Sequence, residues 1–152
     1  MFYRDSEFFD LSFAQTSLID YPNEVCLCLN TKGCKNNCIY CFNKSLAKGN
    51  PLSFDVAKLA IDANMQYISS ISITGGEPLL NDDLSQIIDY AHDNNLKTKI
   101  DTSLNGDINN ISSNIDLINI SIKNYSHLLS ILDKVTNSFT VSIYTLPPLS
   151  PV

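Results

Sequence analysis

The chemistry of this chain is expected at three closely spaced cysteines, Cys34, Cys38 and Cys41. The Cys-x3-Cys-x2-Cys spacing lets a short loop turn its thiolates toward a common centre, and thiolate is the form of cysteine that binds metal. Three sulfur ligands suit three corners of a four-iron cluster and leave the fourth iron without a protein ligand. That open position can hold a reactant, whereas a closed structural site normally has four protein ligands. The spacing therefore favours an iron–sulfur cluster.

Two other interpretations of these cysteines stay open, a zinc site and unliganded thiols. Zinc would need a fourth ligand, and no candidate stands in a paired Cys-x-x-Cys spacing. The candidates are Cys26, Cys28, His92 and His127. We interpret His92, near a predicted helix end, and also His127 as surface residues. Disulfide bonds fit poorly, because the chain has five cysteines, an odd number, and its N-terminus does not resemble a secretory signal peptide.

The composition indicates one globular domain. Apolar residues make up 44% of the 152 residues and charged residues 17%, which is enough for a single core. The net charge of −6 disfavours binding to a nucleic-acid backbone or to an anionic membrane surface. No apolar run approaches the ~20 residues that span a bilayer, so we expect a cytoplasmic protein.

The elements that must position the cysteines follow from hydrophobic periodicity and from turn residues. We expect strands over residues 24–30, 68–74, 97–101, 115–123 and 138–144, and helices over residues 53–66, 82–95 and 125–135. Strands that alternate with helices imply parallel βαβ units with right-handed crossovers. About five units are too few for a closed eight-stranded barrel. The predicted fold is therefore α/β, an open partial (β/α) barrel of about five to six parallel strands.

A single domain is expected over residues 1–152, with a lead-in over residues 1–23, a core over residues 24–145 and a tail over residues 146–152. The end of the lead-in, which contains Pro22, is interpreted as a surface turn before the first strand. The cysteine loop then lies just past the carboxyl end of that strand, where open α/β folds and barrels place their chemistry.

Alternation divides the first strand into two faces. Val25, Leu27 and Leu29 are expected on one face. Cys26 and Cys28 lie on the other, where they are badly placed to bridge each other. Because free cysteines are commonly buried as small apolar residues, we interpret both as core residues.

A second motif, Gly75-Gly76-Glu77-Pro78, directly follows the second predicted strand. Alone it indicates a tight turn, because glycine tolerates conformations that other residues avoid. When it follows a three-cysteine loop at the end of the preceding strand, the motif indicates a ligand-binding site more specifically than it does alone. Glycines let the backbone approach a small ligand closely, and carbonyl groups at a strand end can accept hydrogen bonds from an ammonium group.

With both motifs intact, the chain resembles the radical S-adenosylmethionine superfamily. Within that superfamily it is most similar to the small activating enzymes of glycyl-radical enzymes, especially the anaerobic ribonucleotide reductase activating proteins. The similarity covers roughly residues 12–125 and is carried by the lead-in over residues 16–22, the cysteine loop over residues 33–43 and the Asp-Thr-Ser segment over residues 101–103. The sequence departs from the family where Asn23 replaces a usual glycine and Ser121 a usual aspartate.

This resemblance implies a cofactor and a reaction. Cys34, Cys38 and Cys41 would hold a [4Fe-4S] cluster whose open iron binds the amino and carboxylate groups of S-adenosyl-L-methionine. Reductive cleavage would give methionine and a 5′-deoxyadenosyl radical, which takes a hydrogen atom from a glycine of the partner, anaerobic ribonucleotide reductase. The electron would come from a donor such as flavodoxin or ferredoxin.

The resemblance also assigns residues to S-adenosylmethionine. By the family pattern, Gly75, Gly76 and Glu77 line its amino group, and Tyr40 lies by its adenine. Looser candidates for contact with its carboxylate or ribose are Asp101, Ser103 and Lys123. Each also has a plainer interpretation: Tyr40 as a loop aromatic, for example, and Lys123 as a solvated strand-end charge.

Two other functions compete with glycyl-radical activation. One is a radical enzyme acting on a small molecule, of the 7-carboxy-7-deazaguanine synthase type, which would call for extra pocket-forming elements. The other is a non-catalytic binding module that carries zinc or an iron–sulfur cluster. Cluster assembly and cleavage of S-adenosylmethionine without oxygen would separate an enzyme from such a module.

Overall fold

The computed structural model describes residues 13–36, 38, 41, 44–122, 125–132 and 141–144, the last four and residue 125 by their backbone alone. Its strands are β1 (Ala14–Ser17), β2 (Cys26–Thr31), β3 (Ser70–Gly75), β4 (Lys97–Thr102), β5 (Leu117–Ser121) and β6 (Val141–Tyr144). Its helices are α1 (Phe54–Asn64), α2 (Leu84–Asp93) and α3 (Tyr125–Leu132), with 3-10 turns η2 (Lys44–Ala47), η3 (Pro78–Leu80) and η4 (Ile108–Asn110). Every predicted strand and helix is present, with ends that differ by a few residues.

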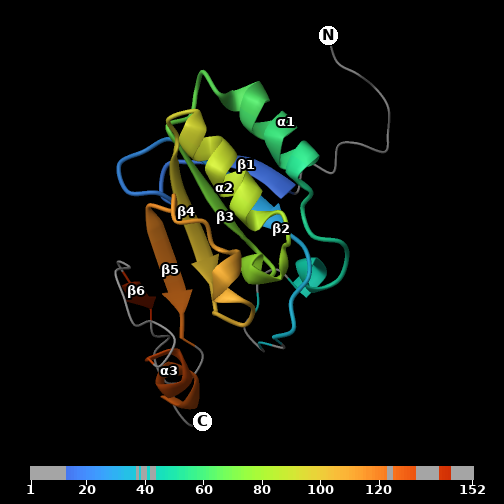
Figure 1. Cartoon of the computed structure of the whole chain (residues 1–152), viewed down its shortest axis with the longest axis vertical. Coiled ribbons are helices and arrows are strands. Elements are labelled where there is room, and N and C mark those ends of the chain that lie inside the picture. The colour runs from blue at the N-terminus through green and yellow to red at the C-terminus, as the bar shows by residue number, and fades with distance from the viewer. Residues whose placement is uncertain are drawn as a thin grey trace, which may run out of the picture.

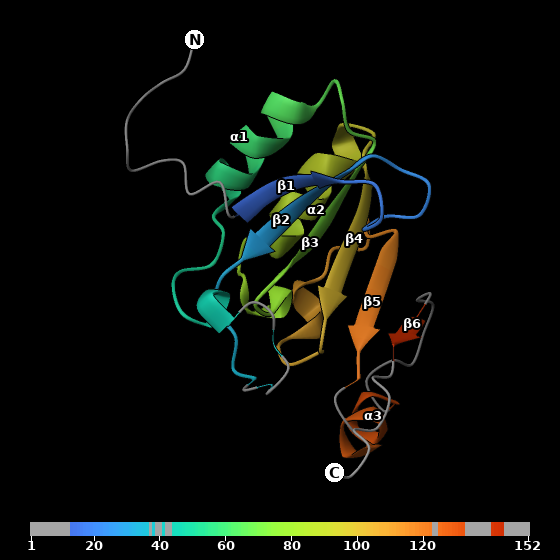
Figure 2. The ribbon, with the colours of Figure 1, turned by 180° about the vertical axis from the view of Figure 1, so that it is seen from behind.

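The strands form one six-stranded sheet in the order β1-β2-β3-β4-β5-β6. The strands from β2 to β6 are parallel, and β1 pairs antiparallel with β2. Because β1 and β6 lie at opposite ends of this order, the sheet stays open. Helices α1 and α2 cover one face, and Figure 2 shows the opposite face, which they leave uncovered (Figures 1 and 2). The predicted open α/β partial barrel is confirmed.

The lead-in differs from the prediction, because residues 14–17 form β1 instead of a surface loop. In the register of this pair Thr16 lies opposite Leu27 and Ser17 opposite Cys26. A strand at the edge of a sheet has unpaired backbone groups, and β1 supplies β2 with hydrogen-bonding partners. The sequence did not indicate this strand, because its side chains are half-buried or exposed and apolar and polar residues do not alternate clearly along it.

The start of α1 is fixed by two side chains. Ser53 is the predicted N-cap, and its Oγ accepts a hydrogen bond from the Val56 N–H at 3.5 Å. The sequence predicts that Asp82 or Asp83 starts α2, and Asp83 precedes that helix but makes no side-chain cap to it. Its Oδ2 instead accepts a hydrogen bond from the Phe54 N–H at 2.8 Å. The carboxylate therefore fastens the first turn of α1 to the start of α2.

The main core lies between the sheet and the two helices. Buried apolar side chains from both layers form one cluster, including Leu27, Leu29, Ile71, Ile73, Ile100, Ile118 and Ile120 of the strands and Ala57, Ile61, Ile87, Ile88 and Ala91 of the helices. Val25, predicted on the same face as Leu27, precedes β2 and is exposed. No helix in the described part of the chain combines the length and the apolar character that crossing a bilayer requires.

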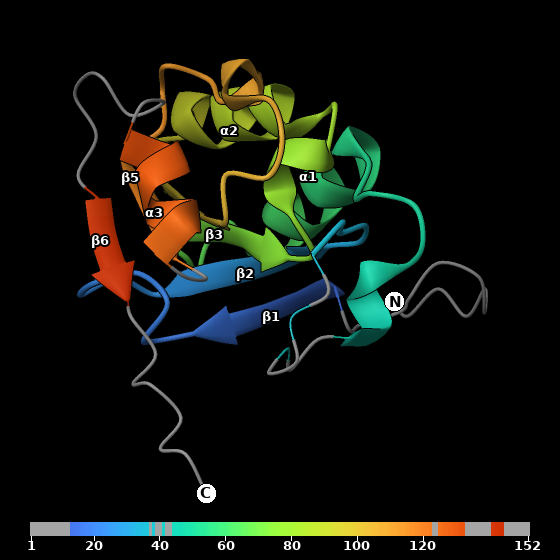
Figure 3. The ribbon, with the colours of Figure 1, turned by 90° about the horizontal axis from the view of Figure 1, so that it is seen from below.

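The carboxyl ends of β2, β3 and β4 lie at one edge of the sheet, with α3 at the same end of the molecule (Figures 1 and 3). The cysteine loop follows β2, the Gly-Gly-Glu segment follows β3, and residues 103–106 follow β4. Parallel strands therefore bring to one edge three segments that are far apart in the sequence.

Candidate active site

The Gly-Gly-Glu turn is joined to the cysteine loop by its backbone. The Gly76 N–H donates to the Thr31 carbonyl oxygen at 2.9 Å, and the Glu77 N–H donates to the Gly33 carbonyl oxygen at 2.8 Å. These bonds continue the pairing of β2 with β3 beyond the ends of the strands. The turn is thereby held against the residue that precedes Cys34.

The glycines of this turn are required by close backbone packing. Gly75 has a φ of +104°, and a Cβ there would lie 2.5 Å from the Thr31 carbonyl oxygen. A Cβ on Gly76 would lie 2.2 Å from the Gly33 carbonyl oxygen. Real Cβ atoms do not come this close to backbone, so a side chain at either position would push the two loops apart. The close approach observed is therefore to the neighbouring loop, and contact of Gly75 and Gly76 with a cofactor stays a prediction.

The Glu77 side chain is buried and faces the end of β4. Its carboxyl group is 1% exposed and accepts hydrogen bonds from the Leu79 N–H at 3.3 Å and the Ser103 N–H at 2.9 Å. The hydroxyl groups of Ser103, at 2.5 Å, and of Thr102 donate to it as well. These hydrogen bonds offset the free-energy cost of burying the carboxylate, and they fasten the Gly-Gly-Glu turn to the end of β4. Its predicted role toward the methionine amino group is untested.

Ser103 is the residue at which the segments meet. Its Oγ accepts a hydrogen bond at 2.6 Å from Nδ2 of Asn36, which lies between Cys34 and Cys38. Asn36 Oδ1 in turn accepts a hydrogen bond from Asn105 Nδ2 at 2.8 Å. Ser103 therefore links the cysteine loop to Glu77.

His127 also reaches this site, contrary to its interpretation as a surface residue. It lies in the first turn of α3, is half-buried, and its Nε2–H donates to the Ser103 carbonyl oxygen at 2.7 Å. The sequence places His127 in a helix, but it does not show that this helix packs over the strand ends. His92, by contrast, is exposed in the last turn of α2 as predicted.

Asp101 belongs to a separate cluster on the face of the sheet that α1 and α2 do not cover. Its Oδ1 lies 3.2 Å from Lys99 Nζ and accepts from Asn119 Nδ2 at 2.5 Å. Its Oδ2 accepts from the Ser72 hydroxyl at 3.3 Å. Asn119 Oδ1 is buried and has no hydrogen-bond partner among the described residues, which makes it an acceptor available to a bound donor group.

The three loop cysteines are free and half-buried. The start of the loop is held by hydrogen bonds from the Gly33 N–H to the Leu46 carbonyl oxygen at 2.8 Å and from the Cys34 N–H to the Ala47 carbonyl oxygen at 3.2 Å. Near its end the Cys41 N–H donates to the Cys38 carbonyl oxygen at 3.2 Å. The 3-10 turn η2 therefore holds the first cysteine beside the carboxyl end of β2.

The donor set of this loop fits an iron–sulfur cluster, with three thiols on one loop and none of them in a disulfide. Across the described residues, no three His, Cys, Asp or Glu side chains lie close enough together to hold a metal ion. Tyr40 and Lys123, the other two residues assigned to the cofactor, lie outside the described residues.

Cys26 and Cys28 are buried core residues, as predicted, and pack with Tyr21 on the uncovered face. A hydrogen bond between the two thiols lowers the pKa of Cys26, and the same contact, together with burial, raises the pKa of Cys28. The Cys28 thiol also contacts the Asp20 carboxylate, whose pKa is lowered chiefly by a hydrogen bond from Ser17. These thiols lie at the opposite end of β2 from Cys34.

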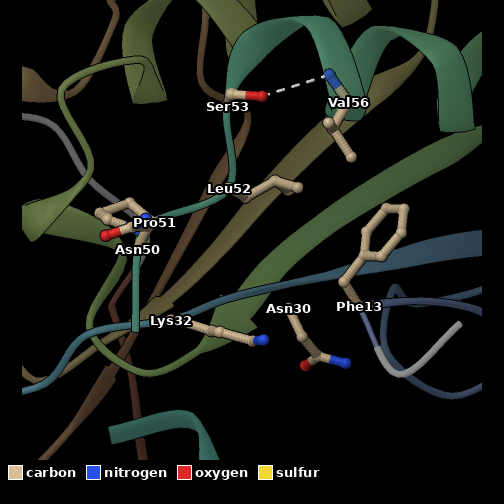
Figure 4. A pocket seen from close by; sticks show the side chains of 8 residues that line it. All are labelled: Phe13, Asn30, Lys32, Asn50, Pro51, Leu52, Ser53 and Val56. Atoms are coloured by element: carbon tan, nitrogen blue, oxygen red, sulfur yellow. Dashed lines mark hydrogen bonds between the residues drawn. The ribbon is translucent and has the colours of Figure 1, made fainter. Parts of the chain in front are cut away.

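A pocket of about 190 Å³ lies between the end of β2 and the start of α1 (Figure 4). The side chains that line it are Phe13, Asn30, Lys32, Asn50, Pro51, Leu52, Ser53 and Val56. The backbone amides of α1 nearest to it already donate to protein groups, Phe54 to Asp83 and Val56 to Ser53. The pocket contains none of the predicted site residues.

Relatives of the chain are found among archaeal proteins. One protein of Methanocaldococcus jannaschii, named "Putative glycyl-radical enzyme activating enzyme MJ1227", is 32% identical over 88 residues, which are 57% of this chain and 37% of that protein. Another protein of the same organism, MJ0907, is 43% identical over 67 residues, 42% of this chain and 23% of that protein. The chain thus spans well under half the length of either relative.

The fold is similar to that of a bacterial protein. The crystal structure of QueE from Escherichia coli matches 86% of this chain and 79% of its own with a TM-score of 0.62 and 12% sequence identity. At that identity the match shows the fold alone. A comparison with protein families matches residues 30–147, more than half of the chain, and this span contains the cysteine loop, the Gly-Gly-Glu turn and the strands from β3 to β6. The chain belongs to the radical SAM superfamily.

Proposed function

We propose that this protein cleaves S-adenosyl-L-methionine at a [4Fe-4S] cluster to generate a glycyl radical on a partner enzyme, anaerobic ribonucleotide reductase. The observation that carries the proposal is the hydrogen bonding between the Gly-Gly-Glu turn and the start of the cysteine loop. Hydrogen bonds from Gly76 and Glu77 to Thr31 and Gly33 hold the Gly-Gly-Glu turn beside the start of the cysteine loop. A cofactor bound at this edge would therefore contact both motifs at once.

The chemistry divides between the cofactor and the chain. When bound by Cys34, Cys38 and Cys41, the cluster supplies the electron that cleaves S-adenosylmethionine into methionine and a 5′-deoxyadenosyl radical, which becomes 5′-deoxyadenosine on taking hydrogen from glycine. A donor protein such as flavodoxin or ferredoxin supplies that electron. The chain holds the loop, orients the cofactor and excludes water. Gly75, Gly76 and Glu77 are proposed to line the cofactor's amino group.

Other contacts to S-adenosylmethionine are proposed for residues beyond the turn. Tyr40 is proposed to lie by its adenine, and Asp101, Ser103 and Lys123 are looser candidates for its carboxylate or ribose. Of these, Ser103 lies at the edge of the sheet that carries both motifs and is bonded to the cysteine loop. Asp101 lies on the uncovered face beside Lys99, where a bound substrate would also pass.

A protein glycine is favoured as the substrate by the similarity to MJ1227, whose name describes a glycyl-radical enzyme activating enzyme. The open sheet agrees, because a folded partner must bring a loop to the edge where the strands end. Asn119 Oδ1, the buried acceptor without a described partner, would suit the N–H of such a loop. The likeness to QueE does not favour a small-molecule substrate, because 12% identity carries the fold alone.

The test is reconstitution with iron and sulfide under anaerobic conditions, followed by reduction and addition of S-adenosylmethionine. We expect broad absorbance near 400 nm, release of methionine, and a glycyl-radical spin signal only when the reductase is present. Cys38→Ala should abolish cluster binding and cleavage. Cys28→Ala, a cysteine on the same strand-loop unit but buried away from the loop, is the matched control and should retain both.

Two results would contradict the proposal in different ways. A colourless protein that binds one zinc tightly would make it a metal-bearing binding module. Cleavage of S-adenosylmethionine that is stimulated by a small heterocyclic substrate, with no radical on the reductase, would keep the chemistry and overturn the partner.

A further inference from the structure

Four side chains form a continuous series of hydrogen bonds from the cysteine loop into the core. Asn105 Nδ2 donates to Asn36 Oδ1 at 2.8 Å, and Asn36 Nδ2 donates to Ser103 Oγ at 2.6 Å. Ser103 Oγ then donates to Glu77 Oε2 at 2.5 Å. The series begins at a half-buried amide and ends at a carboxyl group that is 1% exposed.

The direction of this series is fixed by chemistry. A carboxylate can only accept, so the single hydroxyl proton of Ser103 must go to Glu77. Ser103 Oγ therefore faces Asn36 as an acceptor, and the Asn36 amide must present its NH₂ group there. Its carbonyl oxygen is left to accept from Asn105. Each group has one orientation that satisfies its neighbours, so the buried carboxylate sets the orientation of a side chain in the cysteine loop.

We propose that Asn36 is a positioning residue for the cluster loop, held in a single orientation by Glu77 through Ser103. This inference rests on the proposed function only in that the loop is taken to bind a cluster. Main-chain bonds fix the start of the loop at Gly33 and Cys34. Asn36 adds an attachment between the first and second cysteines.

Such an attachment matters because a cluster takes one ligand from each of the three cysteines, so the loop must hold them in a fixed arrangement. A loop that binds a ligand loses conformational freedom, and an anchor between its ligands reduces that loss. His127 strengthens the anchor from the other side, since its Nε2–H donates to the Ser103 carbonyl oxygen at 2.7 Å. Ser103 is thus held by α3 as well as by Glu77.

The test uses Asn36→Asp, which keeps the shape of the side chain and removes its NH₂ donor. The new carboxylate competes with Glu77 for the Ser103 hydroxyl proton, so the loop should detach. In reduced, metal-free protein we expect Cys34 and Cys38 to be alkylated about tenfold faster than in the unaltered chain, the upper end of what the loss of one neutral hydrogen bond brings about. Mass spectrometry of the separate peptides measures each rate. A reconstituted cluster should lose iron to a chelator faster by a similar factor.

The chain supplies its own controls. Asn50→Asp makes the same chemical change at an exposed position outside the series and should leave both rates unaltered. The buried thiols of Cys26 and Cys28 report general loosening of the fold, and they should stay unreactive in Asn36→Asp. Because alkylation is measured without metal, it does not depend on whether the protein cleaves S-adenosylmethionine or on which partner it activates.

The double variant Asn36→Asp with Glu77→Gln tests the direction of the series. The glutamine introduced by Glu77→Gln can donate its NH₂ group to Ser103 Oγ. The Ser103 hydroxyl proton is then free to be donated to the carboxylate at position 36. The direction of donation along the series is thereby reversed. The bond from the Ser103 N–H is lost, so we expect partial recovery, with Cys34 and Cys38 reacting more slowly than in Asn36→Asp alone. No recovery would overturn the fixed direction. Equal rates in Asn36→Asp and Asn50→Asp, or equal acceleration at Cys26 and Cys28, would overturn the positioning role.

Discussion

The two faces of the sheet are built from opposite chemistry, and on β3 the side chains of both faces are buried. On β3, Ile71 and Ile73 point into the core against α1 and α2, whereas their neighbours Ser70 and Ser72 belong to the other face, and all four side chains are fully buried. One face is stabilised by removing apolar surface from water. The other must satisfy each polar group with a partner.

The polar face accordingly forms a network of contacts. Lys99 Nζ donates to the Asp20 carbonyl oxygen at 2.7 Å and lies 3.2 Å from the Asp101 carboxylate. Asp101 also accepts from Ser72 and Asn119. Packing on the helical face can thus hold the sheet together while the polar face presents charges and hydrogen-bonding groups. The same strands supply an apolar core on one side and a polar surface on the other.

The largest effect is expected from breaking the apolar face. Ile73→Ala removes a fully buried side chain and should cost about 2–5 kcal/mol of unfolding free energy. Ser72→Ala, the adjacent residue on the other face, loses one hydroxyl that donates at 3.3 Å and should cost about 1 kcal/mol. Urea unfolding curves measure both. Equal costs would show that the two faces contribute alike to stability.

An intermediate effect is expected from Lys99→Met, which keeps the apolar stem and removes the ammonium group. Asp101 would keep two hydrogen bonds but lose its cation, so we expect a loss of about 1–3 kcal/mol in the free energy of unfolding. Lys97→Met on the same strand is the matched control. Its side chain is 54% exposed in the pair with Glu24, where solvent screens the charges, so that change should cost clearly less than Lys99→Met.

The smallest effect is expected from Asp20→Asn, and it should depend on pH. Hydrogen bonds from Ser17 and Cys28 hold the pKa of Asp20 below its ordinary value of 3.8. The carboxylate therefore stabilises the fold above that value and ceases to do so as pH falls through its lowered pKa. We expect the variant to be less stable by about half a kcal/mol at pH 6, because solvent screens this half-exposed group. In urea titrations the difference should shrink as the pH falls below 3.8 and through the lowered pKa of Asp20.

Local sequence rules predicted the fold well where one element decides its own structure. Ser53 was identifiable as a helix cap from its position alone, and the βα alternation predicted the parallel sheet. Partners far apart in the chain were not predictable. Asp83 looks like the cap of the helix it precedes but serves α1, and His127 looks like a surface residue until α3 packs at the strand ends.

The site was predictable to a similar extent. The cysteine spacing and the Gly-Gly-Glu segment predicted that the two motifs meet at one edge of the sheet, and they do, because the carboxyl ends of parallel strands share that edge. Asn36 gave no signal, since an asparagine between two cysteines has no pattern of its own. Its contact with Ser103 depends on how residues 67 positions apart come together in the fold.

The bonded pair of loops also constrains how such a chain can change over generations. Gly76 leaves no room for a side chain against Gly33, so substitutions there are excluded whatever the substrate. Ser72 and Asn119 lie on the face of the sheet opposite the helices, and their side chains bond to Asp101. Close packing against a backbone does not restrict these two positions to glycine. Random libraries should therefore recover more residue types at Ser72 and Asn119 than at Gly76.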